Sequence, residues 1–366
     1  MEPRDLSSFA AYSPGTDREA AIREAGFDPD DVLSLDRNQN PFGPSPGAVA
    51  AVREHAGAVH SYPKAVHADL TSALADRWDV DDEQVWLTHS GTGALDYLAR
   101  AFLDPGQRVL HSRPGFSYTS TSARYHGGEA DIYELSKDED FAQTPGTVLD
   151  AYDGHRIVYV TTPHNPTGTE MALEDVRAVA ERTDEETLVV VDEAYGEFTD
   201  TPSAVRLVEE REDVAVVRTF SKAYGLAGMR VGYAVTPAAW ADAYARVNTP
   251  FAVSTLACQA GLAALDDESH LERTVETVEW ARQYLRAELD ARTWPSGGNF
   301  VLADVGDATV VTGACRERGV VIRDCSGHGL PECVRVSCGT RAETRAAVET
   351  MNDVLDERTV RGTSGK

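Results

Sequence analysis

The sequence predicts an α/β protein in which helices flank a mostly parallel central sheet and a smaller α/β domain follows. Three observations predict it. Short apolar, β-branched runs alternate with segments of helical periodicity through most of the chain, and strands separated by helices are typical of βαβ units. One long helical pattern near residue 270 interrupts this alternation. The length of 366 residues allows one large domain and a smaller companion.

The candidate strands of the central sheet are short apolar runs bounded by turn residues. They are Val85–Thr88, Arg108–His111, Arg156–Thr162, Thr187–Val191 and Val214–Arg218. Between the third and the fourth lies Leu173–Thr183, whose apolar side chains fall on one face of a helix. This order predicts parallel strands that are joined by helices.

The change of pattern in the later part of the chain marks the smaller domain. A long helix is expected to start at a capping box of Ser269 and Glu272 and to run to about Asp290. The stretch Trp294–Gly298 then breaks the pattern. Candidate strands beyond the break are Asn299–Val305, Val320–Arg323 and Val334–Ser337.

A second capping box, of Thr340 and Glu343, predicts the last helix, and the tail from Arg358 is expected to be frayed. The expected domains are therefore a large one over residues 41–270 and a small one over residues 271–366. The N-terminal segment, residues 1–40, is expected to pack on the small domain.

The composition excludes several partners. The formal net charge is -26, so nucleic acid and anionic lipid surfaces would repel the protein. Positive charge comes mostly from arginine, because the chain has only four lysines: Lys64, Lys137, Lys222 and Lys366. An acidic surface with little lysine favours a halophilic protein, whose self-repulsion is screened by salt, over an ordinary acidic one.

Cysteine usage and the N-terminus predict a cytoplasmic protein without a structural metal. The five cysteines contain no CxxC pair, and His328 beside Cys325 does not complete a ligand set. No signal-peptide core is visible, and no apolar stretch reaches the roughly 18 residues of a membrane span. We therefore expect no metal and no membrane partner.

The most informative segment runs from Thr219 to Gly232 and lies directly after a candidate strand. Ligands of open α/β sheets bind at this edge. Hydroxyls, one lysine and one arginine on a glycine-rich turn can hold a phosphate while they present an amine. A lysine in a turn is usually solvated, but Lys222 is flanked by small and apolar residues in a chain that is poor in lysine.

Two further segments lie directly after candidate strands. Asp192 ends the apolar run Thr187–Val191, and a buried acid at this position must be paired. Its partner is either a helix terminus or the protonated pyridinium nitrogen of a cofactor. The third segment, Thr161–Gly168, contains an Asn-Pro and a Thr-Gly pair and by itself is a turn.

These three segments, in this order, resemble those of the fold-type I aminotransferases, which depend on pyridoxal 5'-phosphate. The resemblance covers nearly the whole chain, and among the subfamilies it is strongest to the histidinol-phosphate aminotransferases. It implies the fold-type I transferase architecture of that class-II family. It extends to Asn38–Pro46, Tyr62-Pro63, Gly298–Val301 and Val334–Thr340.

The resemblance implies roles for residues around the cofactor ring. Lys222 would be the Schiff-base lysine, and Asp192 would pair with the pyridine nitrogen. Asn165 and Tyr195 would hydrogen-bond the ring hydroxyl. Phe116 occupies the position that stacks on the ring, although plain core packing is an equal interpretation of this residue without the family.

The cofactor phosphate would be bound by Thr219, Ser221 and Arg230. Backbone amides at Gly91 and Thr92, at the start of an expected helix, also suit a phosphate. The sequence departs from the family here, because relatives usually carry an acidic residue where Thr92 or Gly93 stands. A second departure is Gln39, in place of the usual glutamate.

Substrate-binding positions are implied by the same resemblance. Arg335 matches a carboxylate-binding arginine, whose fork suits a bidentate contact. Arg323 and Tyr12 match residues that help to hold the substrate phosphate, although either could be a solvated surface residue. Asn40 is also assigned to the substrate site. Tyr62 matches a tyrosine that reaches the cofactor phosphate of a neighbouring subunit, which implies a homodimer.

The implied reaction moves an amino group between L-histidinol phosphate and 2-oxoglutarate, giving imidazole-acetol phosphate and L-glutamate, in histidine biosynthesis. A decarboxylase of a phosphorylated amino acid and an aromatic amino-acid aminotransferase are the alternatives within this chemistry. A nucleotide-binding oxidoreductase is disfavoured because Asp96 stands where its glycine fingerprint needs a third glycine. A DNA-binding regulator would need a segment that we do not find.

Overall fold

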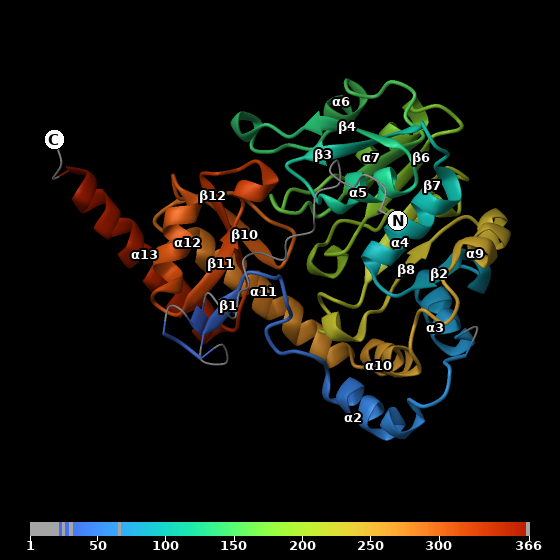
Figure 1. The fold of residues 1–366 in the computed structure, drawn as a ribbon, viewed down its shortest axis with the longest axis horizontal. Helices are drawn as coiled ribbons and strands as arrows, with labels where there is room; N and C mark the ends of the chain where they lie inside the picture. Colours follow the sequence, from blue (N-terminus) through green and yellow to red (C-terminus); the bar gives the residue numbers. More distant parts are fainter. Residues whose placement is uncertain (1–21, 24–25, 29–31, 65–66, 364–366) are drawn as a thin grey trace, which may run out of the picture.

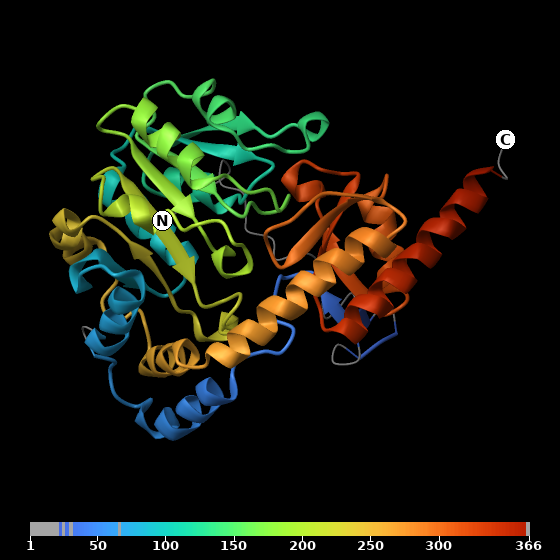
Figure 2. The same ribbon diagram turned by 180° about the vertical axis from the view of Figure 1, so that it is seen from behind.

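The computed structural model describes residues 1–366 except 1–21, 24–25, 29–31, 65–66 and 364–366. The described residues form two sheets (Figures 1 and 2). The larger has the strand order β2-β8-β7-β6-β5-β3-β4, and the smaller has the order β1-β11-β12-β10-β9. The long helix α11 (Glu268–Glu288) runs from one to the other.

The strands of the larger sheet are β2 (Val85–Thr88), β3 (Arg108–Arg113), β4 (Glu129–Glu134), β5 (Ile157–Thr161), β6 (Leu188–Asp192), β7 (Val214–Thr219) and β8 (Gly232–Val235). Only β8 runs against the others, since it pairs antiparallel with both β2 and β7. The mostly parallel sheet is thus confirmed, and the five expected strands are present with ends that differ by at most two residues.

Both faces of this sheet are covered, because strand residues alternate between two hydrophobic clusters. Val189 and Val191 of β6 point into one cluster, while Leu188 and Val190 point into the other. The first cluster contains residues of α3 (Ala68–Trp78), α7 (Leu173–Arg182), α8 (Val205–Val208) and α10 (Thr255–Leu265). The second contains residues of α4 (Gly91–Phe102), α5 (Tyr118–Tyr125) and α9 (Ala241–Val247). Burial on both sides explains the continuous apolar runs of these strands.

The smaller sheet consists of β1 (Leu33–Leu35), β9 (Arg292–Thr293), β10 (Phe300–Asp304), β11 (Val320–Asp324) and β12 (Cys333–Ser337). Helices α12 (Ala308–Arg316), α13 (Arg341–Thr363) and the later half of α11 supply its hydrophobic cluster. β1 joins this sheet by pairing with β11. The expected packing of residues 1–40 on the small domain otherwise falls mostly outside the described residues, and the boundary at residue 270 stays a prediction.

The ends of the later helices confirm one expectation and correct two. Thr340 and Glu343 form the expected capping box, with Glu343 Oε2 accepting from Thr340 N at 2.7 Å. The predicted cap of α11 is wrong, because the side chain of Asp267 accepts from His270 N and the helix starts at Glu268. The prediction of a frayed tail from Arg358 is also wrong, because α13 continues to Thr363.

Polar contacts join the segment after β4 to the smaller sheet and its connections. Lys137 Nζ lies 2.7 Å from Asp304 Oδ2 and 2.9 Å from Glu332 Oε1. Asp140 accepts hydrogen bonds from the side chains of Arg292 and Trp294. No helix in the described ranges is long and apolar enough to cross a membrane.

Candidate active site

The site lies where the parallel strands β5, β6 and β7 end, because each leads directly into one of the three segments singled out in the sequence. Parallel strands present their carboxyl ends at one edge of a sheet. Asn165 comes after β5, Asp192 ends β6, and Lys222 comes after β7. The fold therefore brings together residues that are far apart in the chain.

Lys222 is surrounded by more positive than negative charge. Burial lowers its pKa to about 7, and the charges of Arg335 and Arg230 contribute, while Asp192 opposes them. Its Nζ donates to Arg37 O at 3.2 Å and lies 5.6 Å from the centre of the Tyr195 ring. A substantial fraction of Lys222 is therefore a neutral amine near neutral pH, which a nucleophile or general base requires.

Asp192 is held by its own backbone turn. Burial raises its pKa to about 6, whereas a hydrogen bond from Ala194 N to Oδ1, at 3.0 Å, acts in the opposite direction. Its neighbour Glu193 is fully engaged, because Oε2 lies 2.6 Å from Nη1 of the buried Arg218. The acid that faces the site is thus Asp192, and it is poised to pair with a cation.

The turn that carries Asn165 is held in place by the hydrogen bonds of a buried histidine. His164 Nε2 lies 2.9 Å from Ser112 Oγ, and its Nδ1 lies 2.8 Å from Thr167 Oγ1. Burial lowers the pKa of His164 to about 3, so the ring is neutral at ordinary pH. This ring anchors the turn after β5, and Asn165 Oδ1 then accepts from Arg335 Nη1.

Two arginines of the small sheet face each other beside Lys222. The antiparallel register of β11 and β12 pairs Arg323 with Arg335 directly. Arg335 Nη2 donates to Asp36 O at 3.0 Å, and Arg323 Nε donates to the same oxygen at 3.3 Å. Arg335 Nε is buried and has no hydrogen-bond partner among the described residues. Because such donors are normally satisfied, this pair is suited to an anionic ligand.

The start of α4 has a geometry that is suited to a second anion. A Cβ at Gly232 would lie 2.5 Å from Gly91 N, so this glycine lets the helix start approach the ends of β7 and β8. Thr219 Oγ1 donates to Ser221 Oγ at 2.9 Å and accepts from Ser221 N, so these hydroxyls are adjacent. Unpaired amides of a first helical turn, with hydroxyls beside them, suit a phosphate.

Two residues near the start of α4, Arg230 and Gly93, have unusual local geometry. Arg230 adopts a left-handed backbone conformation with φ 56°, and its Nη1 donates to Ala227 O. A Cβ at Gly93 would lie 2.7 Å from the ring of His89. An acidic residue at position 93 would therefore require the ring of His89 to move.

The remaining predicted residues differ in how deeply they are buried. Tyr195 is buried, and its hydroxyl accepts from Asn38 Nδ2 at 3.0 Å. Phe116 lies after β3 and is partly buried. Asn40 donates to Ala223 O at 2.6 Å and accepts from Phe42 N, so it holds the backbone next to Lys222. Tyr62 is 85% exposed. Tyr12 lies outside the described residues.

Asn38 and its partner Ser337 are residues near the catalytic candidates that the sequence alone did not assign. Asn38 lies in the Asn-rich segment that the resemblance includes, and it is 1% exposed with φ 54°. Asparagine tolerates this conformation better than most residues, but the sequence does not reveal that it contacts Tyr195.

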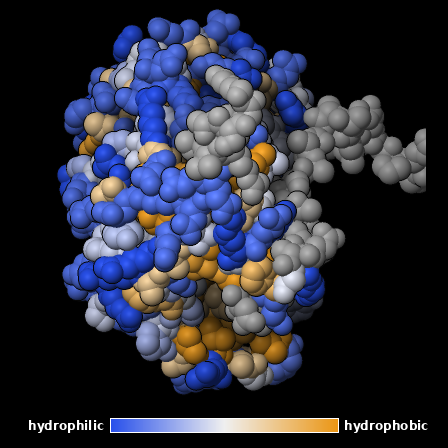
Figure 3. Space-filling view, turned by 90° about the vertical axis from the view of Figure 1, so that its left-hand side faces the viewer, coloured by the Kyte–Doolittle hydropathy of each residue, from blue (hydrophilic) through white to orange (hydrophobic). Residues whose placement is uncertain are grey.

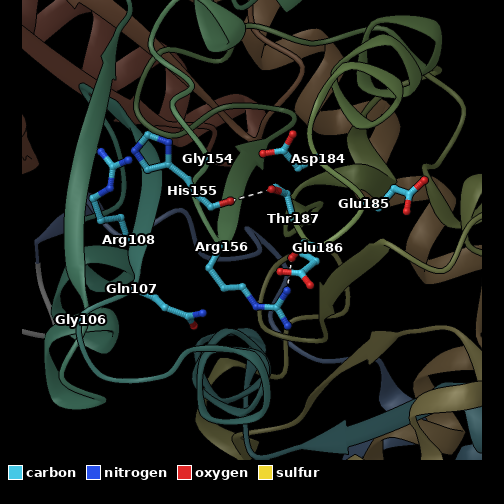
Figure 4. A pocket seen from close by; sticks show the side chains of 10 residues that line it. All are labelled: Gly106, Gln107, Arg108, Gly154, His155, Arg156, Asp184, Glu185, Glu186 and Thr187. Carbon is cyan, nitrogen blue, oxygen red and sulfur yellow. Dashed lines mark hydrogen bonds between the residues drawn. The ribbon is translucent and has the colours of Figure 1, made fainter.

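A surface hollow of about 580 Å³ lies elsewhere (Figure 4). It is lined by residues 106–108, 154–156 and 184–187, which lie at or just before the starts of β3, β5 and β6. Some of its polar groups bond one another; for example, Thr187 Oγ1 donates to His155 O at 2.7 Å. Because it opens at the amino ends of the strands, it is separate from the site around Lys222. Within the described ranges, no three His, Cys, Asp or Glu side chains form a metal-binding group.

Comparisons with known proteins agree with this geometry. The family model of aminotransferase class I and II matches residues 30–351. The chain is 63% identical to a histidinol-phosphate aminotransferase of Haloarcula marismortui, over 98% of this chain and 99% of that protein. It is 61% identical to the enzyme of the same name from Natronomonas pharaonis, over 97% of this chain and 100% of that one. Both sources are halophilic archaea, in line with the acidic composition.

A solved structure is similar over almost the full length. It is the histidinol-phosphate aminotransferase of Sinorhizobium meliloti in complex with pyridoxal-5'-phosphate, with a TM-score of 0.86 and 27% sequence identity. The match covers 97% of this chain and 99% of that chain.

Proposed function

Because the chain belongs to the aminotransferase class I and II family, we propose that it transfers an amino group between L-histidinol phosphate and 2-oxoglutarate, in histidine biosynthesis. The observation that carries this proposal is the direct pairing of Arg323 with Arg335 beside Lys222. Two adjacent guanidinium groups concentrate positive charge at this point of a protein of net charge -26. Arginine binds carboxylate and phosphate equally well, as a shared site for glutamate and a phosphorylated amine requires.

We infer that pyridoxal 5'-phosphate is the cofactor, and the residues present fit it. Lys222 would hold the group through its amine, and Asp192 would pair with the ring nitrogen. The start of α4, with Thr219, Ser221 and Arg230, would bind the phosphate. When bound, the cofactor supplies an electron sink for the α-carbon of the substrate.

The residues of the chain would then position the substrate and move its proton. Arg335 holds the anionic end of either substrate, so that the α-carbon faces Lys222. Lys222, as a neutral amine, would take the proton from this carbon and return it two atoms further along, to the carbon on the other side of the amino nitrogen. Asp192 keeps the ring nitrogen protonated because the paired carboxylate stabilises the positive charge. Tyr195 and Asn165 are proposed to contact the ring hydroxyl, and Phe116 to lie against the ring.

The substrate assignment is tested in single half-reactions. Protein loaded with the cofactor is mixed in high salt with L-histidinol phosphate, glutamate, phenylalanine, tyrosine or aspartate, and loss of the cofactor absorption band is followed. We expect fast loss with L-histidinol phosphate and with glutamate. Preference for phenylalanine or tyrosine would favour the aromatic alternative. Release of carbon dioxide without glutamate formation would favour the decarboxylase.

Two variants make this test specific. Arg335→Lys should weaken the binding of both L-histidinol phosphate and glutamate by about 10–100-fold. This is the effect of losing charged hydrogen bonds of about 1.5–3 kcal/mol. Arg323→Gln should weaken the binding of the phosphorylated substrate more than the binding of glutamate. The exposed Arg246, 79% accessible in its side chain, provides the control Arg246→Lys. Equal responses of both substrates to Arg323→Gln would contradict the assignment of Arg323 to the phosphate.

We also propose that the chain acts as a homodimer in which Tyr62 serves the neighbouring site. The rings of Tyr62 and Phe251 form a tilted pair with centres 5.2 Å apart, although both rings are exposed, and Val59 is 68% exposed. Hydrophobic side chains gather at the lower end of the face in Figure 3, the end that α2 (Pro46–His55) and α10 occupy in Figure 1. Exposed apolar groups of this kind are typical of an interface.

Mixing two inactive forms tests the shared site. A heterodimer of Tyr62→Phe and Lys222→Ala chains would contain one intact site if Tyr62 acts across the interface. Random mixing should then restore about a quarter of wild-type activity, because half of the dimers are mixed and each has one working site of two. Light scattering should give twice the chain mass of 39.6 kDa. A monomer, or no gain on mixing, would exclude the proposal.

A further inference from the structure

A short segment after β1 crosses the site and touches most of its charged groups. Arg335 donates to the carbonyl of Asp36, and Lys222 donates to the carbonyl of Arg37. Asn38 is the next residue. Asp36 and Arg37 contact the site through their main chain, whereas Asn38 contacts it through its side chain. It reaches the hydroxyl of Tyr195.

The hydrogen bonds of Asn38 determine which of its atoms faces Tyr195. Ser337 Oγ accepts from Asn38 N at 2.8 Å and donates its proton to Asn38 Oδ1 at 2.9 Å. Asn38 O accepts from Asn299 Nδ2 at 3.0 Å. With its amide oxygen used by Ser337, Asn38 presents Nδ2, which is only a donor, to the phenol oxygen of Tyr195 at 3.0 Å.

We propose that Asn38 is a positioning residue that fixes the direction of the Tyr195 hydroxyl proton. Since Asn38 Nδ2 cannot accept, the phenol must direct its own proton away from Asn38. It then donates to the cofactor group held between Asp192 and Lys222. This part of the inference rests on the proposed function. Ser337 takes part through the amide of Asn38. It lies on β12 of the smaller sheet, whereas Tyr195 follows β6 of the larger sheet.

Other charged groups around Tyr195 do not replace this function. Its pKa is raised by burial and by Asp192, and is lowered by the charge of Arg335 and by the hydrogen bond from Asn38. Arg335 is a cation with no acceptor for the phenol proton, and Asp192 lies at the end of the strand before Tyr195. Among the described residues, the amide of Asn38 is the group that hydrogen-bonds the phenol.

Replacement by aspartate reverses the contact. The carboxylate in Asn38→Asp would accept the phenol proton, so Tyr195 could no longer donate to the ring hydroxyl of the cofactor. Negative charge would then concentrate on that oxygen and favour the protonated form of the nitrogen that Lys222 supplies. The pH midpoint of the cofactor absorption band should therefore rise by about one unit, the effect of one hydrogen bond.

A double-mutant cycle separates this effect from the added charge. The midpoint is measured in wild type, Asn38→Asp, Tyr195→Phe and the double variant. We expect Tyr195→Phe to raise the midpoint in wild type and to leave it unchanged in the Asn38→Asp background. An equal shift in both backgrounds would show that the phenol proton does not depend on Asn38, and would overturn the proposal.

Ser337→Ala is the second variant, and it keeps the experiment decisive if Asn38→Asp does not fold. It frees the amide of Asn38 to turn its oxygen toward Tyr195, so the midpoint should rise in the same direction by a smaller amount. Thermal unfolding of each variant measures stability separately, and a purely structural role would lower stability without moving the midpoint. If the wild type takes up no cofactor, the proposed function itself fails, an outcome distinct from an unchanged midpoint.

Discussion

Lys222→Arg is expected to lower kcat by at least about four orders of magnitude, because the variant loses both a nucleophile and a proton-transferring group. Arginine keeps the positive charge, but its guanidinium is not deprotonated in proteins. The wild-type amine, with a pKa of about 7, is partly neutral at ordinary pH. Steady-state turnover with glutamate as donor, in high salt, measures the effect.

The matched control is Lys64→Arg. Lys64 is 62% exposed in its side chain and pairs with Asp69 on the surface, so its replacement should change turnover by less than about twofold, as exposed ion pairs contribute little. If Lys222→Arg kept a tenth or more of wild-type kcat, Lys222 would not be the group that moves the proton.

Asp192→Asn is expected to have the next largest effect. The amide keeps an oxygen that can accept from Ala194 N, so the turn should be preserved. It removes the negative charge opposite the ring nitrogen, and breaking such a buried pair costs about 3–5 kcal/mol, or about 10²–10⁴-fold. We expect a loss of this size in kcat/KM, together with weaker cofactor binding in equilibrium titrations.

The exposed Asp242, 94% accessible in its side chain, gives the control Asp242→Asn, which should behave like wild type. A loss smaller than about threefold in Asp192→Asn would mean that the carboxylate does not stabilise a cation in the transition state. The acid would then have the alternative role of a structural cap.

The sequence was sufficient for five strands of the larger sheet, β2, β3, β5, β6 and β7, but not for β4 and β8, and it was sufficient for the three segments that follow β5, β6 and β7. Apolar runs separated by helices predict parallel strands, and the segments that come after parallel strands meet at one edge of the sheet. Asn165, Asp192 and Lys222 therefore meet for a reason that is visible in the order of elements. Their chemical roles depend on the resemblance to a family and on the tests above.

Local capping was only partly predictable. Asp267 and Ser269 are both good N-caps, and no feature of the segment itself ranks one over the other. In the structure, the ring of His270 contacts Gly43 O at 3.1 Å, so a distant backbone group favours the start at Glu268.

Contacts that depend on strand register or on distant parts of the chain could not be read from the sequence. The pairing of Arg323 with Arg335 depends on the register of two strands joined by a loop. The bond from Asn38 to Tyr195 joins residues 157 positions apart, and that from Asn38 to Ser337 spans 299 positions. A one-residue shift in either strand would turn these side chains to the other face.

The most direct measurement concerns the covalent state of Lys222. Purified protein is incubated with pyridoxal 5'-phosphate, reduced with borohydride and digested, and the peptides are analysed by mass spectrometry. We predict one reduced cofactor per chain, attached to the peptide that contains Lys222. Attachment to Lys64 or Lys137, or no stable attachment at all, would contradict the account.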